Sequence, residues 1–257
     1  MTTHRTKKRY GWLPDLPDQR DFLYAAPPET LRSLPSKVNM EALCPPVYDQ
    51  GQLGSCTANA IGAAVQFDWM KQNTHGSEVP SRLFIYYQER VIEGTVGFDS
   101  GAQLRDGIKV VAQFGAPPET EWPYDIAKFT DKPPAQVYTD ALLDEAVRYS
   151  RVRQSASQMK GCLAAGFPFV IGFTVYESFE SQAVASSGIV PMPKQGEAVL
   201  GGHAVMAVGY DDATQRFRMR NSWGIGWGQA GYFEMPYAYL TDRTLSQDFW
   251  TIRLMET

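Results

Sequence analysis

The sequence lacks several features that mark membrane and disulfide-rich proteins. Its longest dense apolar run covers ten residues, 167–176, and includes a proline and a glycine, whereas a membrane-spanning helix needs about 20 apolar residues. Three cysteines in 257 residues, Cys44, Cys56 and Cys162, are too few and too irregularly spaced for a disulfide framework. We therefore expect no membrane span and at least one free thiol.

An excess of basic residues is missing as well. Four of the 24 Lys and Arg residues lie in residues 1–10, which hold no acid, so the remaining chain carries 20 basic against 28 acidic residues. This balance argues against a nucleic-acid partner. We interpret residues 1–10 as a solvated tail. No apolar segment follows that tail, so no secretory signal peptide is expected, and the compartment is left open between the cytoplasm and export by a signal-independent route.

Closely spaced metal ligands of the CxxC or HxxxH type are absent, and we expect neither a metal nor an organic cofactor. What the chain does have is the composition of a compact globular protein, with 44% hydrophobic and 12% aromatic residues. Its 22 glycines and 17 prolines exclude a long helical bundle and indicate many loops.

The apolar pattern changes between the two halves of the chain. The expected helices cover residues 56–73, 81–93, 102–114 and 157–165, and the alternating or β-rich segments cover 146–153, 169–176, 203–210 and 216–222. Ser55 is the expected N-cap of the first helix. A helical half followed by a β half predicts an α+β fold with a cleft where the two halves meet.

Residues 1–33 form a leader with a different character. Residues 1–36 hold five prolines, and the apolar side chains from Tyr10 to Tyr24 fit neither a helical nor a strand period. Two interpretations are open. The leader packs on the body and covers the cleft as a regulator, or it wraps around the back of the domain and only adds stability.

Cys56 is a candidate nucleophile because it opens the predicted helix over 56–73. Free backbone N–H groups and the helix dipole favour a thiolate there and can lower a cysteine pKa from about 8.5 to between about 3.5 and 7.5. The alternative is an ordinary buried cysteine, since free cysteine is among the most buried residue types.

His203 is the candidate base. Of the three histidines, His4 and His75 lie in the tail and in a polar loop, whereas His203 opens the apolar strand in GGHAVMAVGY. Asn221 lies on the following strand, in NSWGIGWG. A four-residue turn would pair Ala204 with Asn221, and a three-residue turn would pair His203 with Asn221 directly. Either register brings an amide beside the imidazole, where it can orient the ring.

With these segments in view, the sequence resembles the papain family of cysteine peptidases, and among them the short bacterial, xylellain-like members. QGQLGSC, GGHAVMAVGY and NSWGIGWG are similar to the family's nucleophile, histidine and asparagine segments in the same order. The resemblance implies a papain-like two-lobed α+β fold over residues 34–257, with a helical N-terminal lobe and an antiparallel β C-terminal lobe. It also implies a cysteine endopeptidase with catalytic residues Gln50, Cys56, His203 and Asn221.

Further roles are carried over by position. The resemblance makes Gly54, Gly101, Gly202, Ala204, Trp223 and Trp227 substrate-binding residues, with Trp223 shielding the contact between His203 and Asn221. Leu53 and Thr57 depart from the family, which has a disulfide cysteine and an aromatic residue at these positions. The expected partner is a peptide or protein substrate of a monomeric enzyme. A papain-like thiol acyltransferase and a non-catalytic peptide-binding domain remain the alternatives.

Overall fold

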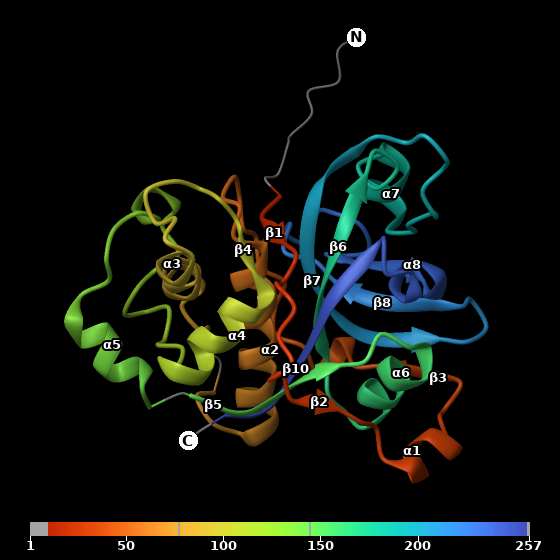
Figure 1. Cartoon of the computed structure of the whole chain (residues 1–257), viewed down its shortest axis with the longest axis horizontal. Coiled ribbons are helices and arrows are strands. Elements are labelled where there is room, and N and C mark those ends of the chain that lie inside the picture. Colours follow the sequence, from red (N-terminus) through yellow and green to blue (C-terminus); the bar gives the residue numbers. More distant parts are fainter. Residues whose placement is uncertain (1–9, 77, 144, 256–257) are drawn as a thin grey trace.

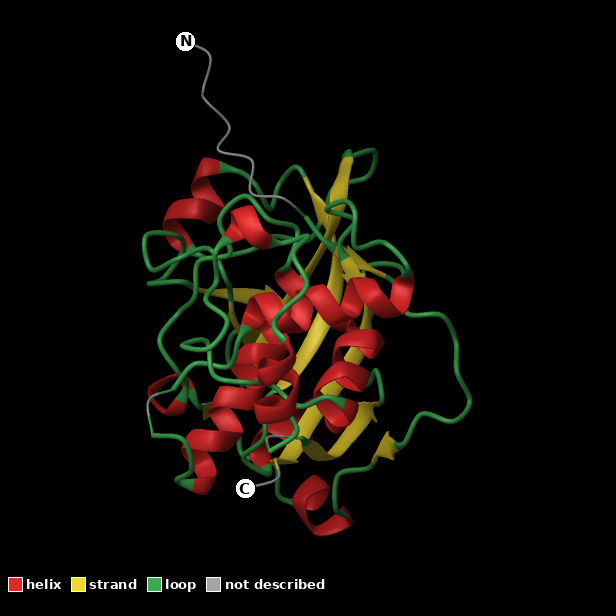
Figure 2. Ribbon diagram, turned by 90° about the vertical axis from the view of Figure 1, so that its left-hand side faces the viewer, coloured by secondary structure: helices red, strands yellow, loops and turns green. Residues whose placement is uncertain are grey.

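The computed structural model describes residues 10–76, 78–143 and 145–255. Helices α3 to α5 lie on one side of the molecule, α2 lies in the middle, and most of the larger sheet lies with α6 to α8 on the other side (Figure 1). Seen from the side, helices pack in front of this sheet (Figure 2). The arrangement confirms the expected α+β, two-lobed fold. The basic tail over residues 1–9 lies outside the described residues.

The helices are α1 (Pro28–Arg32), α2 (Cys56–Gln72), α3 (Arg82–Glu93), α4 (Leu104–Gln113), α5 (Ala135–Ala141), α6 (Ala156–Ala164), α7 (Gln182–Ser187) and α8 (Tyr237–Thr241). The strands are β1 (Trp12–Leu13), β2 (Leu23–Tyr24), β3 (Lys37–Asn39), β4 (Ala102–Gln103), β5 (Ala146–Val152), β6 (Phe169–Tyr176), β7 (Val199–Asp211), β8 (Arg216–Arg220), β9 (Tyr232–Pro236) and β10 (Ser246–Met255). In the larger sheet the strand order is β2-β5-β10-β6-β7-β8-β9, with β3 added on β7. In the part of the chain that is described, no helix combines the length and apolar character needed to cross a membrane.

Helix α2 runs through the middle of the molecule. All its residues from Cys56 to Trp69 are buried, which the many alanines allow because small side chains let the sheet and the neighbouring helices approach closely. The helix ends at Asn73, which takes the left-handed conformation. Ser55 occupies the N-cap position as expected, but its hydroxyl bonds Tyr124 instead of capping the helix.

The register between β7 and β8 differs from both expectations. Tyr210 pairs with Phe217, and Met206 pairs with Arg220 beyond a bulge, so neither Ala204 nor His203 faces Asn221. The turn has the expected four residues but is shifted by one position, because Asp211 pairs with Arg216 and Gln215, with a left-handed φ of 55°, belongs to the turn and not to the strand. The two strands nevertheless remain neighbours, which keeps Asn221 close to β7.

The leader is more structured than its sequence predicts. Besides β1 and β2 it forms the short helix α1, which begins after Pro27 because proline suits the first turn of a helix. Strand β1 pairs in parallel with β4 of the helical lobe, and β2 pairs in parallel with β5 at the sheet edge. The leader therefore contacts both lobes.

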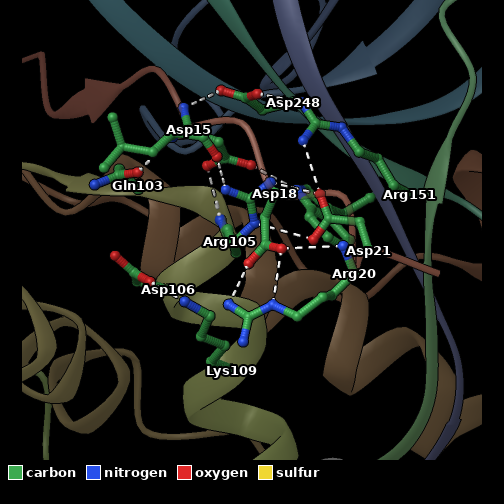
Figure 3. A network of polar contacts seen from close by, with 12 residues as sticks. Asp15, Asp18, Arg20, Asp21, Gln103, Arg105, Asp106, Lys109, Arg151 and Asp248 are labelled. Carbon is green, nitrogen blue, oxygen red and sulfur yellow. Dashed lines mark hydrogen bonds and ion pairs between the residues drawn. The ribbon is translucent and has the colours of Figure 1, made fainter. Parts of the chain in front are cut away.

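A polar network around Asp15 joins this leader to the body (Figure 3). The carboxylate of Asp15 accepts hydrogen bonds from the backbone N–H of Arg105 at 2.9 Å and from the indole of Trp250 at 2.9 Å. Its own backbone N–H donates to Asp248 at 2.8 Å. Burial, and then the nearby Asp248 carboxyl, raise the pKa of Asp15 to about 7.

A second acidic residue of the leader extends the network. Asp21 forms ion pairs with Arg105 of α4 and with Arg151 of β5, and Arg151 in turn pairs with Asp248 at 2.8 Å. The arginines bridge the helical lobe, the sheet and the leader. Residues 15–21 are thus held by hydrogen bonds that come from both lobes.

Candidate active site

A buried histidine–asparagine pair lies at the start of the second lobe. Nε2 of His203 and Oδ1 of Asn221 are 2.8 Å apart, and neither residue has appreciable solvent exposure. Trp223 stacks on the imidazole with ring centroids 4.7 Å apart and an interplanar angle of 28°. The indole therefore packs directly against the ring that shares this contact with Asn221.

The two residues meet because β7 and β8 are adjacent. His203 lies on β7 opposite Phe173 of β6, and Asn221 directly follows β8. Phe173 and Phe179 contact the imidazole with ring centroids 5.7 and 6.4 Å away. The ring is packed by aromatic side chains.

Cys56 is the first residue of α2, as the sequence predicts, and its thiol is fully buried. The expected low pKa is wrong for this covered state. Burial raises the pKa of Cys56 to about 12, although backbone hydrogen bonds from Ala204 and Gly11 act in the opposite direction. Ala204 is the neighbour of His203, so the nucleophile candidate lies beside the histidine strand. Gly11 belongs to the leader.

Gln50 is buried in the loop before α2. Its backbone N–H donates to the carbonyl of Ser222 at 2.9 Å, and its side-chain oxygen accepts from the hydroxyl of Ser222 at 2.6 Å. The side-chain amide donates to the carbonyl of Leu53 at 3.0 Å. These bonds tie the nucleophile loop to the residue that follows Asn221.

Gly54 and Gly101 lie against the backbone of leader residue Gly11. A Cβ on Gly11 would overlap the carbonyl of Gly54, and a Cβ on Gly101 would overlap the carbonyl of Gly11. The same Gly11 carbonyl accepts a hydrogen bond from the N–H of Ala102 at 2.7 Å. Three backbones approach each other here only because glycine has no side chain.

Gly202 and Ala204 lie beneath the next leader residue, Trp12. Gly172 pairs with Ala204 across β6 and β7, so these small residues share one face of the sheet. A Cβ on Gly172 would overlap the indole of Trp12, and a Cβ on Gly202 would overlap its ring and its carbonyl oxygen. The side chain of Trp12 is accordingly buried, with 6% of the residue exposed.

Trp227 extends the group of aromatic side chains around His203, with its ring centroid 5.2 Å from that of Trp223. Tyr10 of the leader lies across this region. Its ring is 6.2 Å from those of His203 and Trp223, and its hydroxyl donates to Glu180.

Leader residues 10–12 thus contact six of the expected positions, namely Gly54, Cys56, Gly101, Gly202, His203 and Trp223. Sequence reasoning gave no role to two contributors to this region. Asp99 accepts the N–H of Gly54 at 3.1 Å, and Phe179 packs on His203. The one feature of the sequence that indicated packing of the leader against the body was its excess of apolar residues.

The fold is two-lobed, with Cys56 on α2 and His203 on β7, and it is shared with solved cysteine proteases. Residues 34–243 match the model of the papain family of cysteine proteases. The chain belongs to this family and is a cysteine peptidase.

Two relatives are similar over almost the whole chain. Xylellain, a cysteine protease from Xylella fastidiosa, is 46% identical and covers 98% of both chains with a TM-score of 0.90. A peptidase C1-like protein, L477, from Acanthamoeba polyphaga mimivirus is 40% identical over 98% of this chain and 89% of its own length. Procathepsin B from Trypanosoma congolense shares the fold at 19% identity, with a TM-score of 0.71 over 88% of this chain.

Proposed function

We propose that the chain is an endopeptidase that hydrolyses peptide bonds through a thioester formed on Cys56. The observation that carries the proposal is the buried 2.8 Å contact between His203 and Asn221, next to a cysteine at a helix start. The thiolate attacks the scissile carbonyl carbon, and the leaving amine takes a proton from His203. Water, deprotonated by His203, then hydrolyses the thioester and frees the thiol.

Two other residues assist these steps. Asn221 orients the imidazole through its side-chain oxygen. The side-chain amide of Gln50 and the backbone N–H of Cys56 stabilise the oxyanion of each tetrahedral intermediate. A substrate would bind with its backbone along Gly54 and Gly101 and with one side chain over Gly202 and Ala204. Trp223 and Trp227 would flank the leaving-group side.

The leader is proposed to cover this site. Gly11 lies on the Cys56 thiol, Trp12 lies on the small residues of β6 and β7, and Tyr10 lies across His203. A substrate would need the same space. Burial under this segment also favours the neutral thiol, because desolvation penalises a thiolate.

The experiment is labelling of the full-length chain with an epoxysuccinyl inhibitor, followed by peptide mapping and a peptide-hydrolysis assay. We expect the label on Cys56, and Cys56→Ala should abolish hydrolysis without loss of folding. Cys44→Ala is the matched control and should behave as wild type. Hydrolysis by folded Cys56→Ala would refute the mechanism, and transfer of the acyl group to an added amine with no hydrolysis would instead indicate an acyltransferase.

A further inference from the structure

A buried pair links the residue after Cys56 to a carboxyl group on another helix. The hydroxyl of Thr57 donates to Oε2 of Glu89, which lies on α3, at 2.8 Å. Both residues are completely buried. Thr57 stands where the sequence departs from the resembled family in having no aromatic residue, and the proposed mechanism uses neither partner.

The fold makes room for the Glu89 carboxyl. A Cβ on Gly107 of α4 would overlap Oε1 of Glu89 and the end of Ile61 from α2. Among the described residues, Oε1 has no hydrogen-bond partner. An apolar side chain of similar size would fill this space without an unpartnered Oε1, so packing alone does not explain a carboxyl here.

The charges around Glu89 do not compensate an ionised carboxylate. Glu93 and Asp106 are acidic neighbours from α3 and α4, and Arg90 is the nearest basic one. The guanidinium of Arg90 is bound to backbone carbonyls, including those of Tyr86 and Val96. Burial is the main reason that the pKa of Glu89 lies well above its usual range. These surroundings therefore disfavour the ionised form of the carboxyl.

Thr57 also acts on the nucleophile through its backbone. A hydrogen bond from the Thr57 backbone lowers the pKa of the Cys56 thiol, whereas negative charge on Glu89 would raise that pKa. The orientation of Thr57 and the neutrality of Glu89 both affect how readily Cys56 becomes a thiolate. Fixing the Thr57 side chain fixes the first turn of α2, from which the proposed oxyanion donor also comes.

We propose that Glu89 is a positioning residue for Cys56, which acts by accepting the hydrogen bond of the Thr57 hydroxyl. The proposal rests on the proposed function and adds a residue to it. Glu89 touches no reacting atom. Its effect is to hold the turn that carries the nucleophile without adding a buried negative charge beside the thiolate.

The test compares Glu89→Gln, Glu89→Leu, Thr57→Val and the Glu89→Leu/Thr57→Val double variant in the full-length chain. Glutamine keeps the shape, the acceptor and the neutrality of the acid, so its kcat should stay within about twofold of wild type. Glu89→Leu and Thr57→Val should each lower kcat about tenfold at unchanged KM, since one hydrogen bond contributes about that factor. The double variant should lose about tenfold as well, because both changes break the same contact.

Asp68→Asn is the matched control, since Asp68 is another buried carboxyl that belongs to α2 but lies far along the helix from Cys56. Its kcat should equal that of wild type. The rate of Cys56 alkylation by iodoacetamide is measured in parallel and should follow the same order among the variants. Alkylation separates the proposed endopeptidase function from the proposed role of Glu89. If the alkylation rate falls in Glu89→Leu but no variant and no wild-type protein hydrolyses peptides, the endopeptidase function is refuted and the positioning role is retained.

Three results would overturn the proposal. If the kcat of Glu89→Gln is as low as that of Glu89→Leu, a neutral acceptor for the Thr57 hydroxyl is not sufficient and the proposal is wrong. A double variant about a hundredfold slower than wild type would exclude action through Thr57. Unchanged kcat and alkylation in Glu89→Leu, with only a lower melting temperature, would make Glu89 a purely structural residue. If Glu89→Leu does not fold, the kcat values of Thr57→Val and Glu89→Gln test the proposal. A slow Thr57→Val variant beside a Glu89→Gln variant with wild-type kcat would support it, and wild-type kcat in Thr57→Val would overturn it.

Discussion

Replacement of Trp12 by alanine should open the active site without any change in the catalytic residues. The indole is 94% buried between the leader and the small residues of β6 and β7. An aromatic side chain of this kind buries about 150–250 Å², which corresponds to roughly 4–6 kcal/mol of transfer free energy. Large aromatic residues replaced by alanine in cores cost about 3–5 kcal/mol.

This loss of free energy from the docked leader should increase the rate at which a reagent labels Cys56. If the thiol reacts only when the leader is displaced, a loss of 3 kcal/mol from the docked state raises the displaced fraction, and so the labelling rate, by about a hundredfold. The assay is the second-order rate of epoxysuccinyl labelling of Cys56 in the full-length chain, read by mass spectrometry. Gly172→Ala attacks the same contact from the other side, because its Cβ would overlap the indole, and should also speed labelling.

The matched control is Phe22→Ala, which removes an aromatic side chain of the leader that is 69% exposed. Its labelling rate should equal that of wild type. A Trp12→Ala rate within twofold of wild type, in a folded protein, would show that this side chain does not keep the nucleophile covered. The reasoning from buried area would then fail at its first step.

Gln50→Ala should lower kcat on the order of 100- to 1,000-fold through loss of an oxyanion donor. Alkylation of the thiol should be affected much less. Equal losses in both assays would mean that Gln50 supports the geometry of the loop that precedes Cys56. Asn221→Ala should reduce hydrolysis less than Cys56→Ala in the same assay, since cysteine and histidine survive in a looser orientation. Burial raises the pKa of Asp68 from its ordinary 3.8 to about 7, so the folded chain binds a proton that the unfolded chain has released, and stability decreases as the pH rises through 7. Asp68→Asn should remove about 1 kcal/mol of the decrease in unfolding free energy between pH 6 and 8, measured with denaturant at both pH values, and an unchanged decrease would exclude Asp68 as its source.

Sequence reasoning predicted α2, β6 and the order of the candidate catalytic residues because these depend on local pattern and short motifs. It could not predict the β7–β8 register, which depends on a bulge and on the left-handed Gln215. The contact between Trp12 and Gly172 was equally out of reach, because the two residues are far apart in the chain and neither belongs to a motif. Burial raises the pKa of Cys56, and a rule based on the helix dipole alone does not take burial into account.

The proposed cover and the alternative stabilising role concern successive parts of the leader. Residues 10–12 lie on the candidate site, whereas Asp15, Asp21 and β2 bind α4, β10 and the β5 edge. Removal of residues 1–33 would therefore uncover the cysteine and also leave the backbone N–H of Arg105 and the indole of Trp250 without their acceptor. Faster labelling of Cys56 in that variant would therefore have two explanations, because the cysteine loses its cover and the contacts of the body with Asp15 are lost as well.

Removal of residues 1–13 alone separates the two effects. It takes away Gly11 and Trp12 but keeps Asp15 with its bonds to both lobes, so the body should retain its unfolding midpoint while Cys56 is labelled much faster. Equal labelling rates for this variant and the full-length chain would assign the leader to stability only. A lower midpoint with faster labelling would mean that β1 itself holds the lobes together, because its pairing with β4 is then part of the fold and not a removable cover.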